Sequence, residues 1–351
     1  MARDSTTSIA GPGARPMAGQ AARAALPPGL MGVARAASAW VRRRAMLLRL
    51  LRETLGDVGR FHRWSHDGRR DRHRLQRESA LLKHYHGLEK GLSLAEPRPG
   101  FGEAKARALA ERLDAWTREH GRDEVTAAAE GSLRAYHAFN RDHGLAMPWL
   151  EGWLRGRDGD GPAEGGVKVL RRAELQDAVR GVGPAFFDSR HSVRAFSAEP
   201  VPLEAIEAAV DMARRTPSVC NRQGPRAYCF RDAMEALRWQ PGNAGFGHLA
   251  SRALVITADL QAFSSPGERH QAYVDGGLFA MSVVYALHAL GYGTCMLAWS
   301  QDRERNAQAR AALSIPPSEV IIMMIAVGCI PEELRVARSW RRPLADILRI
   351  R

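Results

Sequence analysis

The stretch from Phe186 to Arg226 constrains this chain more than any other, because it places polar clusters on both sides of a clear helix pattern. Its first part, Ser189 to Arg194, holds two guanidiniums, a hydroxyl and an imidazole within six residues. From Pro202 to Arg215, apolar residues recur at the spacing that lines one face of a helix, and acids occupy the early turns, where the helix dipole favours them. Pro217 ends that pattern, and a polar loop that reaches Gln223 follows.

The first cluster has the chemistry of a phosphate grip. An arginine offers a planar fork of donors that binds phosphate oxygens in pairs, and the hydroxyl of Ser192 adds a short donor. The later loop supplies Ser218 and Asn221, whose side chains can hydrogen-bond the polar edge of a flat heterocycle. Taken alone, Arg-x-Ser-x-Arg is a weak signal, because most such clusters are solvated surface.

The order of these parts resembles the opening of the nitroreductase family of FMN flavoproteins. The shared pattern is Arg-His-Ser-x-Arg-x-Phe, then Pro-Val-Pro at a helix start, then Pro-Ser-x-x-Asn-x-Gln. The resemblance covers residues 183–348 and implies an α+β fold, a mixed sheet flanked by helices, here with a basic helical N-terminal extension. The family often continues after Gln with Pro and an aromatic residue, whereas this chain has Gly224-Pro225-Arg226. We therefore expect divergence on the substrate side.

The resemblance also implies roles around FMN. Arg190 and Ser192 hold the phosphate, Arg194 reaches the pyrimidine side of the ring, and the Pro-Ser-Asn loop approaches from the partner subunit. The turn after residue 291 presents backbone amides to the flavin N5 edge, and a basic patch at residues 338–342 lies near the phosphate. The implied FMN-binding residues are Arg190, His191, Ser192, Arg194, Pro217, Ser218, Asn221, Gly293, Thr294 and Arg341. No catalytic residue is assigned, since the flavin carries the redox chemistry.

Further patterns complete the expected domain. Strands are expected over 226–231, 253–258 and 319–329, and an apolar helix over 271–291. In the resembled family the equivalent helix forms the dimer core. Gln240 to Gly247 is glycine-rich but lacks the Lys-Ser/Thr of a nucleotide P-loop, and we expect a mobile surface loop. Cys295 is expected to be a small buried hydrophobe.

The positive charge belongs to the N-terminal arm. Residues 1–80 contain sixteen arginines and six acids, which account for +10 of the net +13. No nucleic-acid-binding module accompanies this charge, so we do not expect a nucleic-acid partner. The four cysteines have no CxxC spacing, which argues against zinc, iron–sulfur or disulfide sites and fits a reducing cytoplasm. We expect no metal site.

The pattern predicts four segments. They are a disordered basic tail over 1–37, a helical region over 38–150, a linker over 151–168 and the FMN-binding domain over 169–351. Met17 and Met31 are alternative translation starts for the tail. Within the helical region, 102–120 and 123–143 show helical spacing.

The helix expected over 38–55 admits two interpretations. Trp40 and several leucines share one face, and the arginines lie mostly opposite, as in an interfacial helix drawn to anionic lipid. The alternative is a helix that packs on its own domain or on a partner subunit.

The His86–Leu92 block, His-Gly-Leu-Glu-Lys-Gly-Leu, resembles an N-terminal region of some nitroreductase-like proteins from bacterial polysaccharide gene clusters. The family assigns no chemistry to this block. Glu89 and Lys90 are adjacent and point to different parts of a helix surface, so we expect structural contacts rather than an acid–base pair.

These patterns favour a cytoplasmic homodimeric oxidoreductase. It would transfer hydride from NAD(P)H through FMN to a small organic acceptor, such as a nitro compound or a quinone. One alternative is a non-catalytic scaffold that keeps the fold, and another is a flavin-mediated step on a glycan or lipid precursor. A peripheral contact with an anionic membrane through 38–55 is a further expectation.

Overall fold

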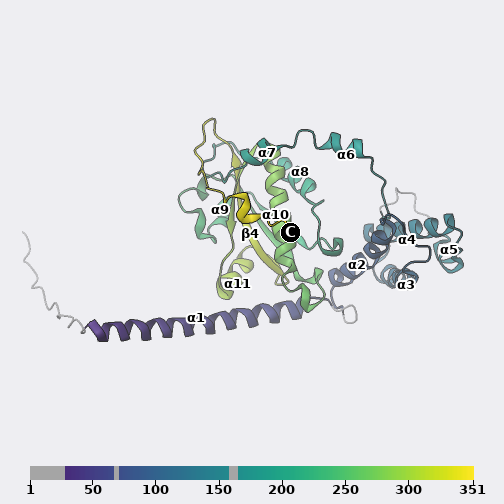
Figure 1. The fold of residues 1–351 in the computed structure, drawn as a ribbon, viewed down its shortest axis with the longest axis horizontal. Coiled ribbons are helices and arrows are strands. Elements are labelled where there is room, and N and C mark those ends of the chain that lie inside the picture. The colour runs from purple at the N-terminus through teal and green to yellow at the C-terminus, as the bar shows by residue number, and fades with distance from the viewer. Residues whose placement is uncertain (1–27, 67–70, 158–164) are drawn as a thin grey trace, which may run out of the picture. The chain divides into compact units, whose positions relative to one another are not determined.

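The computed structural model describes residues 28–66, 71–157 and 165–351, with side chains described from residue 37 onward. The chain divides into two units, Met1–Thr54 and Leu55–Arg351. Helix α1 (Pro28–Trp64) crosses that boundary, and its first part is what the structure describes of the first unit. All other labelled elements belong to the second unit (Figure 1).

The helical region of the second unit has four helices around a leucine-rich core. They are α2 (Arg74–Leu92), α3 (Glu103–His120), α4 (Glu124–Asp142) and α5 (Pro148–Leu154). Asp123 caps helix α4, because its side chain accepts a hydrogen bond from the backbone N–H of Thr126. The fully buried leucines of this core are Leu88, Leu109, Leu113, Leu133 and Leu150. The helices expected over 102–120 and 123–143 are confirmed to within one residue.

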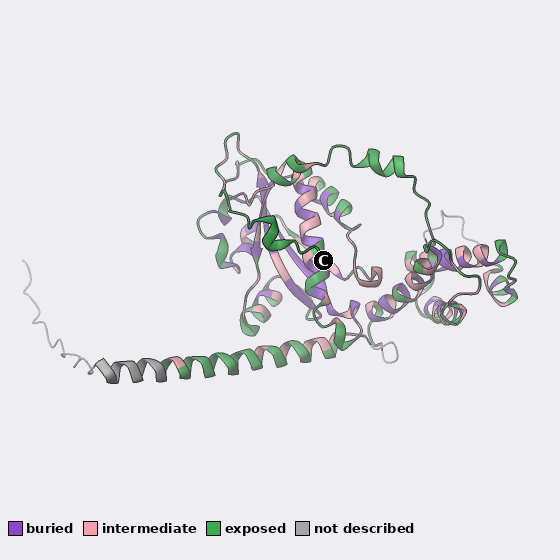
Figure 2. Ribbon diagram, viewed as in Figure 1, coloured by how far each residue is buried: buried purple, intermediate pink, exposed green. Residues whose placement is uncertain are grey.

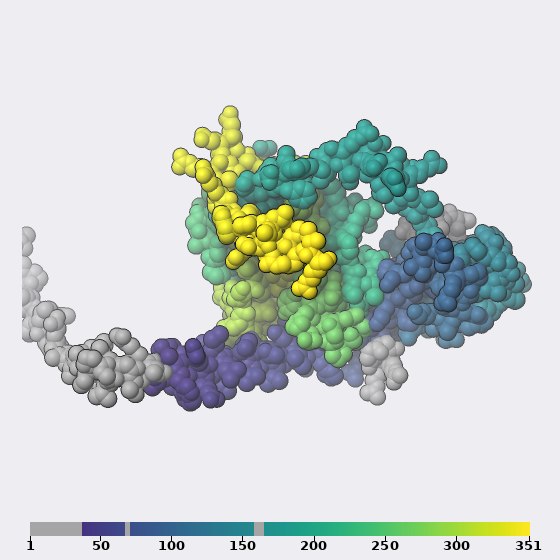
Figure 3. Space-filling view, viewed as in Figure 1, coloured from purple at the N-terminus to yellow at the C-terminus, as the bar shows by residue number. Residues whose placement is uncertain are grey.

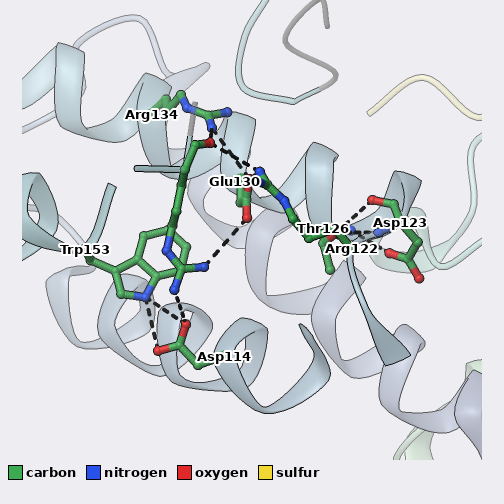
Figure 4. Close-up of polar contacts among 8 residues, drawn as sticks. Asp114, Arg122, Asp123, Thr126, Glu130, Arg134 and Trp153 are labelled. Atoms are coloured by element: carbon green, nitrogen blue, oxygen red, sulfur yellow. Dashed lines mark hydrogen bonds and ion pairs between the residues drawn. The ribbon is translucent and has the colours of Figure 1, made fainter. Parts of the chain in front are cut away.

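A buried carboxylate holds α4 to the chain that follows α5. Glu130 is 1% exposed and lies against the guanidiniums of Arg122, Arg134 and Arg157 (Figure 4). Arg157 also pairs with Asp114 of α3 at 2.7 Å. A carboxylate this deeply buried is tolerated only with such partners, so the cluster fixes the end of the helical region.

The His86–Leu92 block makes structural contacts, as expected for Glu89. One carboxylate oxygen of Glu89 accepts hydrogen bonds from the Ser132 hydroxyl of α4 (3.2 Å) and from the backbone N–H of Gly166 (3.1 Å). A Cβ at Gly91 would lie 2.0 Å from the ring of Phe101, so only glycine fits beside that ring.

The remaining part of the second unit is an α+β domain, and this expectation is confirmed. Its strands are β1 (Pro225–Phe230), β2 (Arg252–Asp259), β3 (Tyr292–Ala298) and β4 (Glu319–Cys329), in the order β1-β2-β4-β3. The pairings between these strands are antiparallel, and an isolated parallel bridge joins Ser192 to Thr294. Its helices are α6 (Arg172–Ala178), α7 (Pro184–Ser189), α8 (Leu203–Ala213), α9 (Ala233–Leu237), α10 (Gln271–Ala289), α11 (Arg303–Ala312) and α12 (Leu344–Ile347).

The alternation of side chains along the strands places helices on both faces of the sheet. Leu254 and Ile256 of β2 pack in one core with α8 and α10, whereas Ala253 and Val255 pack in another core with α9 and α11. The buried strands and the exposed α1 contrast clearly in Figure 2. The apolar helix expected over 271–291 is confirmed as α10.

Two of the expected segment boundaries need correction. Residues 28–37, expected in the disordered tail, begin helix α1, because Pro28 is compatible with a helix start and the alanines that follow favour helix. The linker expected over 151–168 starts inside α5, and Gly165 and Gly166 pack on α4; residues 158–164 lie outside the described part. Residues 1–27 also lie outside it.

The segment Gln240 to Gly247 is packed rather than loose, which is a further correction. The side-chain amide of Gln240 donates to the carbonyl of Ala298 (2.9 Å), and that of Asn243 donates to the carbonyl of Leu237 (2.7 Å). Phe246 is buried in the core of the sheet face that carries α9. These bonds satisfy the polar groups that would otherwise hold the segment in solvent.

We predict opposite effects for two glycines of α2. Gly91→Ala forces a methyl group into the Phe101 ring and should lower the free energy of unfolding by about 1–3 kcal/mol. Gly87→Ala is the matched control, since its Cβ would meet no atom within 4 Å, and it should raise that free energy by about 0.5–1 kcal/mol. Thermal and urea unfolding measure both changes, and a Gly91→Ala protein as stable as Gly87→Ala would contradict the packing described.

Candidate functional site

The segment Arg190 to Phe196 is laid along the outer edge of β3 by its apolar residues. Val193 is 3% exposed and donates its backbone N–H to the carbonyl of Thr294 (2.8 Å). Phe196 is 8% exposed and occupies the space that a side chain at Gly328 would need. These two anchors leave the polar residues between and before them at the surface, with Ser192 half-buried and Arg194 exposed.

The cationic side chains of this segment are not neutralised by neighbouring acids. Among the described residues, Arg190 and His191 have no side-chain hydrogen bond or ion pair, and Arg194 bonds only the carbonyl of Ser192, at 3.4 Å. Two guanidiniums that lack a carboxylate partner beside a free hydroxyl form a site to which an anion is attracted.

Helix α7, which ends at Ser189, fixes the position of Arg190. The hydroxyl of Ser189 lies 2.9 Å from Nε2 of His288, near the end of α10. The ring of Phe186 packs against those of Tyr285 and His288. Arg190 therefore follows a helix that is held to α10 by both a polar and an aromatic contact.

The loop Thr216 to Gln223 lies against α10 and is closed by its own hydrogen bonds. The hydroxyl of Ser218 accepts from the backbone N–H of Gln223 (2.9 Å), and the carboxylate of Asp275 accepts from that of Val219 (3.1 Å). Within the loop, Val219–Asn221 forms a short 3-10 turn.

A cavity of about 350 Å³ opens beside this loop. Its lining includes Pro217 and Ser218 from the expected site, together with Arg214, Arg226 and Phe279, which the sequence did not single out. Asn221 does not line it. The cavity has an apolar wall with arginines at its rim, the usual make-up of a site for a flat, partly polar ligand.

The two groups of expected residues lie at diagonally opposite corners of the sheet. The loop leads into Pro225 of β1, which is in register with Val320 of β4 through Ala258. Ser192 is in register with Thr294 of β3, which pairs with Val327 of β4. Seven residues along β4 correspond to about 23 Å at about 3.3 Å per residue, and the two edges add the width of the sheet.

Gly293 and Thr294 lie in strand β3 rather than in the turn expected for them. The strand was missed because its glycines weaken the strand pattern. A Cβ at Gly293 would lie 3.0 Å from Val193, so the glycine admits the Arg190–Phe196 segment. The Thr294 carbonyl is occupied by Val193, and both residues are buried. Their evident task is to carry this segment.

Arg341 is exposed in the segment after β4, which lies on the surface (Figure 3, yellow). Its guanidinium donates to the carbonyl of Ser339. The segment does leave the sheet at the same corner, since the backbone N–H of Ser197 donates to the carbonyl of Cys329 (3.0 Å).

Arg222 is the residue of this site that sequence reasoning missed. It is 1% exposed, and its guanidinium pairs with Glu268 at 2.8 Å. The sequence signal was small, because an arginine between Asn221 and Gln223 reads as part of a solvated loop. Cys295, in contrast, is confirmed as a buried small hydrophobe at 1% exposure, and burial raises the pKa of its thiol.

Comparison with known proteins finds a family model that is similar to this domain. The model of the Nitroreductase family matches residues 188–241 and 231–329, from the end of α7 to the end of β4. The similarity to this family therefore lies in the α+β domain. Comparison with curated protein sequences gives no match.

Several solved structures are similar to the chain. A nitroreductase family protein from Streptococcus pneumoniae TIGR4 is 20% identical, covering 47% of this chain and 98% of its own, with a TM-score of 0.42. A putative nitroreductase from Desulfovibrio desulfuricans, solved in complex with FMN, is 22% identical. The match covers 47% of this chain and 95% of that protein, with a TM-score of 0.41. An FMN-dependent nitroreductase from Clostridium difficile R20291 is 20% identical. The match covers 44% of this chain and 91% of that protein, with a TM-score of 0.38.

Proposed function

We propose that this protein is an FMN-dependent oxidoreductase that passes hydride from NAD(P)H to a small organic acceptor such as a nitro compound or a quinone. The observation that carries the proposal is the anchored Arg190–Arg194 segment, whose two arginines have no acid partner in the described part of the chain, within a domain that matches the Nitroreductase family model. When bound, FMN supplies the redox chemistry.

The chain's own residues would bind and tune that cofactor. Arg190 and Ser192, with Arg341 from the C-terminal segment, would neutralise the phosphate, and His191 lies between them. Arg194 would place positive charge near the pyrimidine edge of the ring. Val193, seated on Gly293 and Thr294, keeps these groups on a rigid edge, which lowers the entropy lost on binding.

We further propose that the working form is a homodimer. The Arg190–Arg194 segment and the Pro217–Asn221 loop occupy opposite corners of one sheet, so one chain cannot close both around a single flavin. In a two-fold dimer each site combines the segment of one chain with the loop of the other. The apolar residues Val274 and Leu278 of α10 are about half-exposed, as a dimer face requires.

As a second proposal, we infer that the protein is cytoplasmic and binds the inner membrane surface through helix α1. Within the first unit, Trp40, Leu48 and Leu51 are at least half exposed along one side of the helix. Five arginines and one glutamate lie between residues 38 and 54, which suits an anionic surface. No helix in the described residues is long and apolar enough to cross a membrane.

Arg190→Ala tests the cofactor. Wild-type protein should show oxidised-flavin absorbance or take up added FMN, and the variant should bind FMN about 10- to 100-fold more weakly, because one charge-assisted phosphate contact is lost. Arg231→Ala, an exposed arginine near β1, is the matched control and should bind as wild type does. Wild-type protein that binds no FMN would refute the proposed function, and an unchanged affinity in Arg190→Ala would remove that residue from the site.

Mixing two defective chains tests the homodimer. An Arg190→Ala chain and a Ser218→Ala/Asn221→Ala chain should each bind FMN weakly. After subunit exchange, about one quarter of the tight sites should return, because half of the dimers are mixed and each holds one intact site. If no tight FMN sites return although mass spectrometry verifies the exchange, then Arg190 and the Ser218–Asn221 loop of one chain bind the same flavin, and the proposed shared site is wrong.

Vesicle co-sedimentation tests the membrane proposal. Full-length protein should sediment with vesicles rich in phosphatidylglycerol, and binding should weaken as salt rises. Leu48→Glu/Leu51→Glu should abolish it, whereas Val169→Glu, which alters a valine that is 91% exposed outside α1, should not. Failure of the wild type to sediment at low salt would discard this proposal and favour packing of α1 on a partner.

A further inference from the structure

The loop that carries Ser218 and Asn221 has an unusual backbone. Cys220, Asn221 and Gln223 all have positive φ values, 50°, 52° and 50°. Residues other than glycine rarely adopt this left-handed conformation, and it costs free energy that surrounding contacts must offset. Three such residues within four positions therefore require a strong local anchor.

Arg222, the remaining residue of the run 220–223, is that anchor. Its side chain is fully enclosed, and its Nη2 donates to Oε1 of Glu268 at 2.8 Å. Its Nε donates back to the carbonyl of Val219 (3.1 Å), and its Nη1 reaches the hydroxyl of Ser264 (3.4 Å). The guanidinium thus holds both ends of the 3-10 turn against the segment after β2.

Glu268 is held in place in turn. Its second oxygen accepts from the backbone N–H of Ser264 at 2.7 Å. Burial acts to raise the pKa of Glu268, but the hydrogen bonds from Arg222 and Ser264 outweigh it and keep that pKa below its ordinary value. The carboxylate is therefore charged and available to Arg222 throughout the neutral range.

The cover over this ion pair comes from the chain before the flavin domain. Nε2 of His66 lies 3.4 Å from Nη1 of Arg222, and burial lowers the pKa of His66 to about 4, so its ring is neutral and can accept. Phe61 and Trp64, at the end of α1, pack in one cluster with Val219 and Phe263.

Helix α2 contributes to the same cover. Nζ of Lys83 donates to the hydroxyl of Ser264 (3.1 Å), and α2 packs on the Val219–Asn221 turn. Residues 61–66 and helix α2 thus contact the loop and its ion pair both by hydrogen bonds and by apolar contacts.

We propose that Arg222 is a positioning residue of the flavin site and that residues 61–66 and helix α2 support that site, because they hold the Ser218–Gln223 loop in its strained conformation. This inference rests on the proposed function, since it assigns the N-terminal extension a role in presenting Ser218 and Asn221 to FMN. A purely structural alternative would have the buried ion pair contribute stability alone.

Glu268→Gln tests this inference against a matched variant. It keeps the size of the side chain and removes the charge that faces Arg222. Glu130→Gln makes the same change at the buried carboxylate of the helical region, which faces Arg122 and is remote from the loop in its contacts. Both variants should lower the melting temperature. Only Glu268→Gln should raise the Kd for FMN, by about tenfold, the size of one lost charge-assisted contact.

The thiol of Cys220 gives a readout that does not need FMN. Cys220 is half-buried within the loop, so its alkylation rate, followed by mass spectrometry of its peptide, reports the loop conformation. We expect this rate to rise several-fold in Glu268→Gln and to stay unchanged in Glu130→Gln. If Glu268→Gln does not fold, Ser264→Ala, which removes one hydrogen bond to Glu268, should change both readouts in the same direction by a smaller factor.

The outcomes separate the two proposals. A wild type that binds no FMN, while Glu268→Gln still exposes Cys220, overturns the proposed function and leaves the anchor standing. A wild type that binds FMN, with the Kd and the Cys220 rate unchanged in Glu268→Gln despite a lower melting temperature, overturns the positioning role.

Discussion

The ion pair between Arg222 and Glu268 connects three parts of this protein that the sequence keeps far apart. It joins the loop before β1 to the segment between β2 and α10, and the end of α1 covers it. Removing a guanidinium from water costs several kcal/mol, which the pair and its hydrogen bonds must offset, so such a pair adds little net stability. What it does provide is a single geometry, because the five donors of arginine are satisfied only in a particular arrangement of neighbours.

The antiparallel sheet determines how far the loop that Arg222 holds lies from the other predicted site residues. The central strand β4 separates the Arg222 loop from the Arg190 segment by seven residues of register as well as by the width of the sheet. Each corner is rigid, one through Arg222 and the other through Val193 and Phe196. In the proposed homodimer, two-fold symmetry would bring the Arg222 loop of one chain to the Arg190 segment of the other, twice in each dimer.

Much of this arrangement could be predicted from the sequence. Strands β1, β2 and β4 and helices α3, α4, α8 and α10 follow from apolar periodicity, because each buries one face or all of its length. The motif order predicted the similarity to the Nitroreductase family that its model then showed over residues 188–329. In contrast, β3 was missed because Gly291 and Gly293 read as a turn, whereas Gly293 is needed to admit Val193. Arg222 was missed because burial of an arginine depends on residues 46 positions later and 156 positions earlier, which no local pattern reveals.

The same long-range contacts change where the flavin domain begins. By composition it starts after the glycine-rich linker, yet Arg60 donates to the backbone carbonyl of Glu319 at 2.8 Å, at the start of the central strand. Burial, with the charge of Arg310, lowers the pKa of Arg60 to about 10, a cost that a dispensable surface contact would not require. Glu89 meanwhile binds Gly166, so the chain is held where it returns from the helical region. The extension therefore contacts the α+β domain at its entry through Arg60 and along α2, and its exit is held through Glu89.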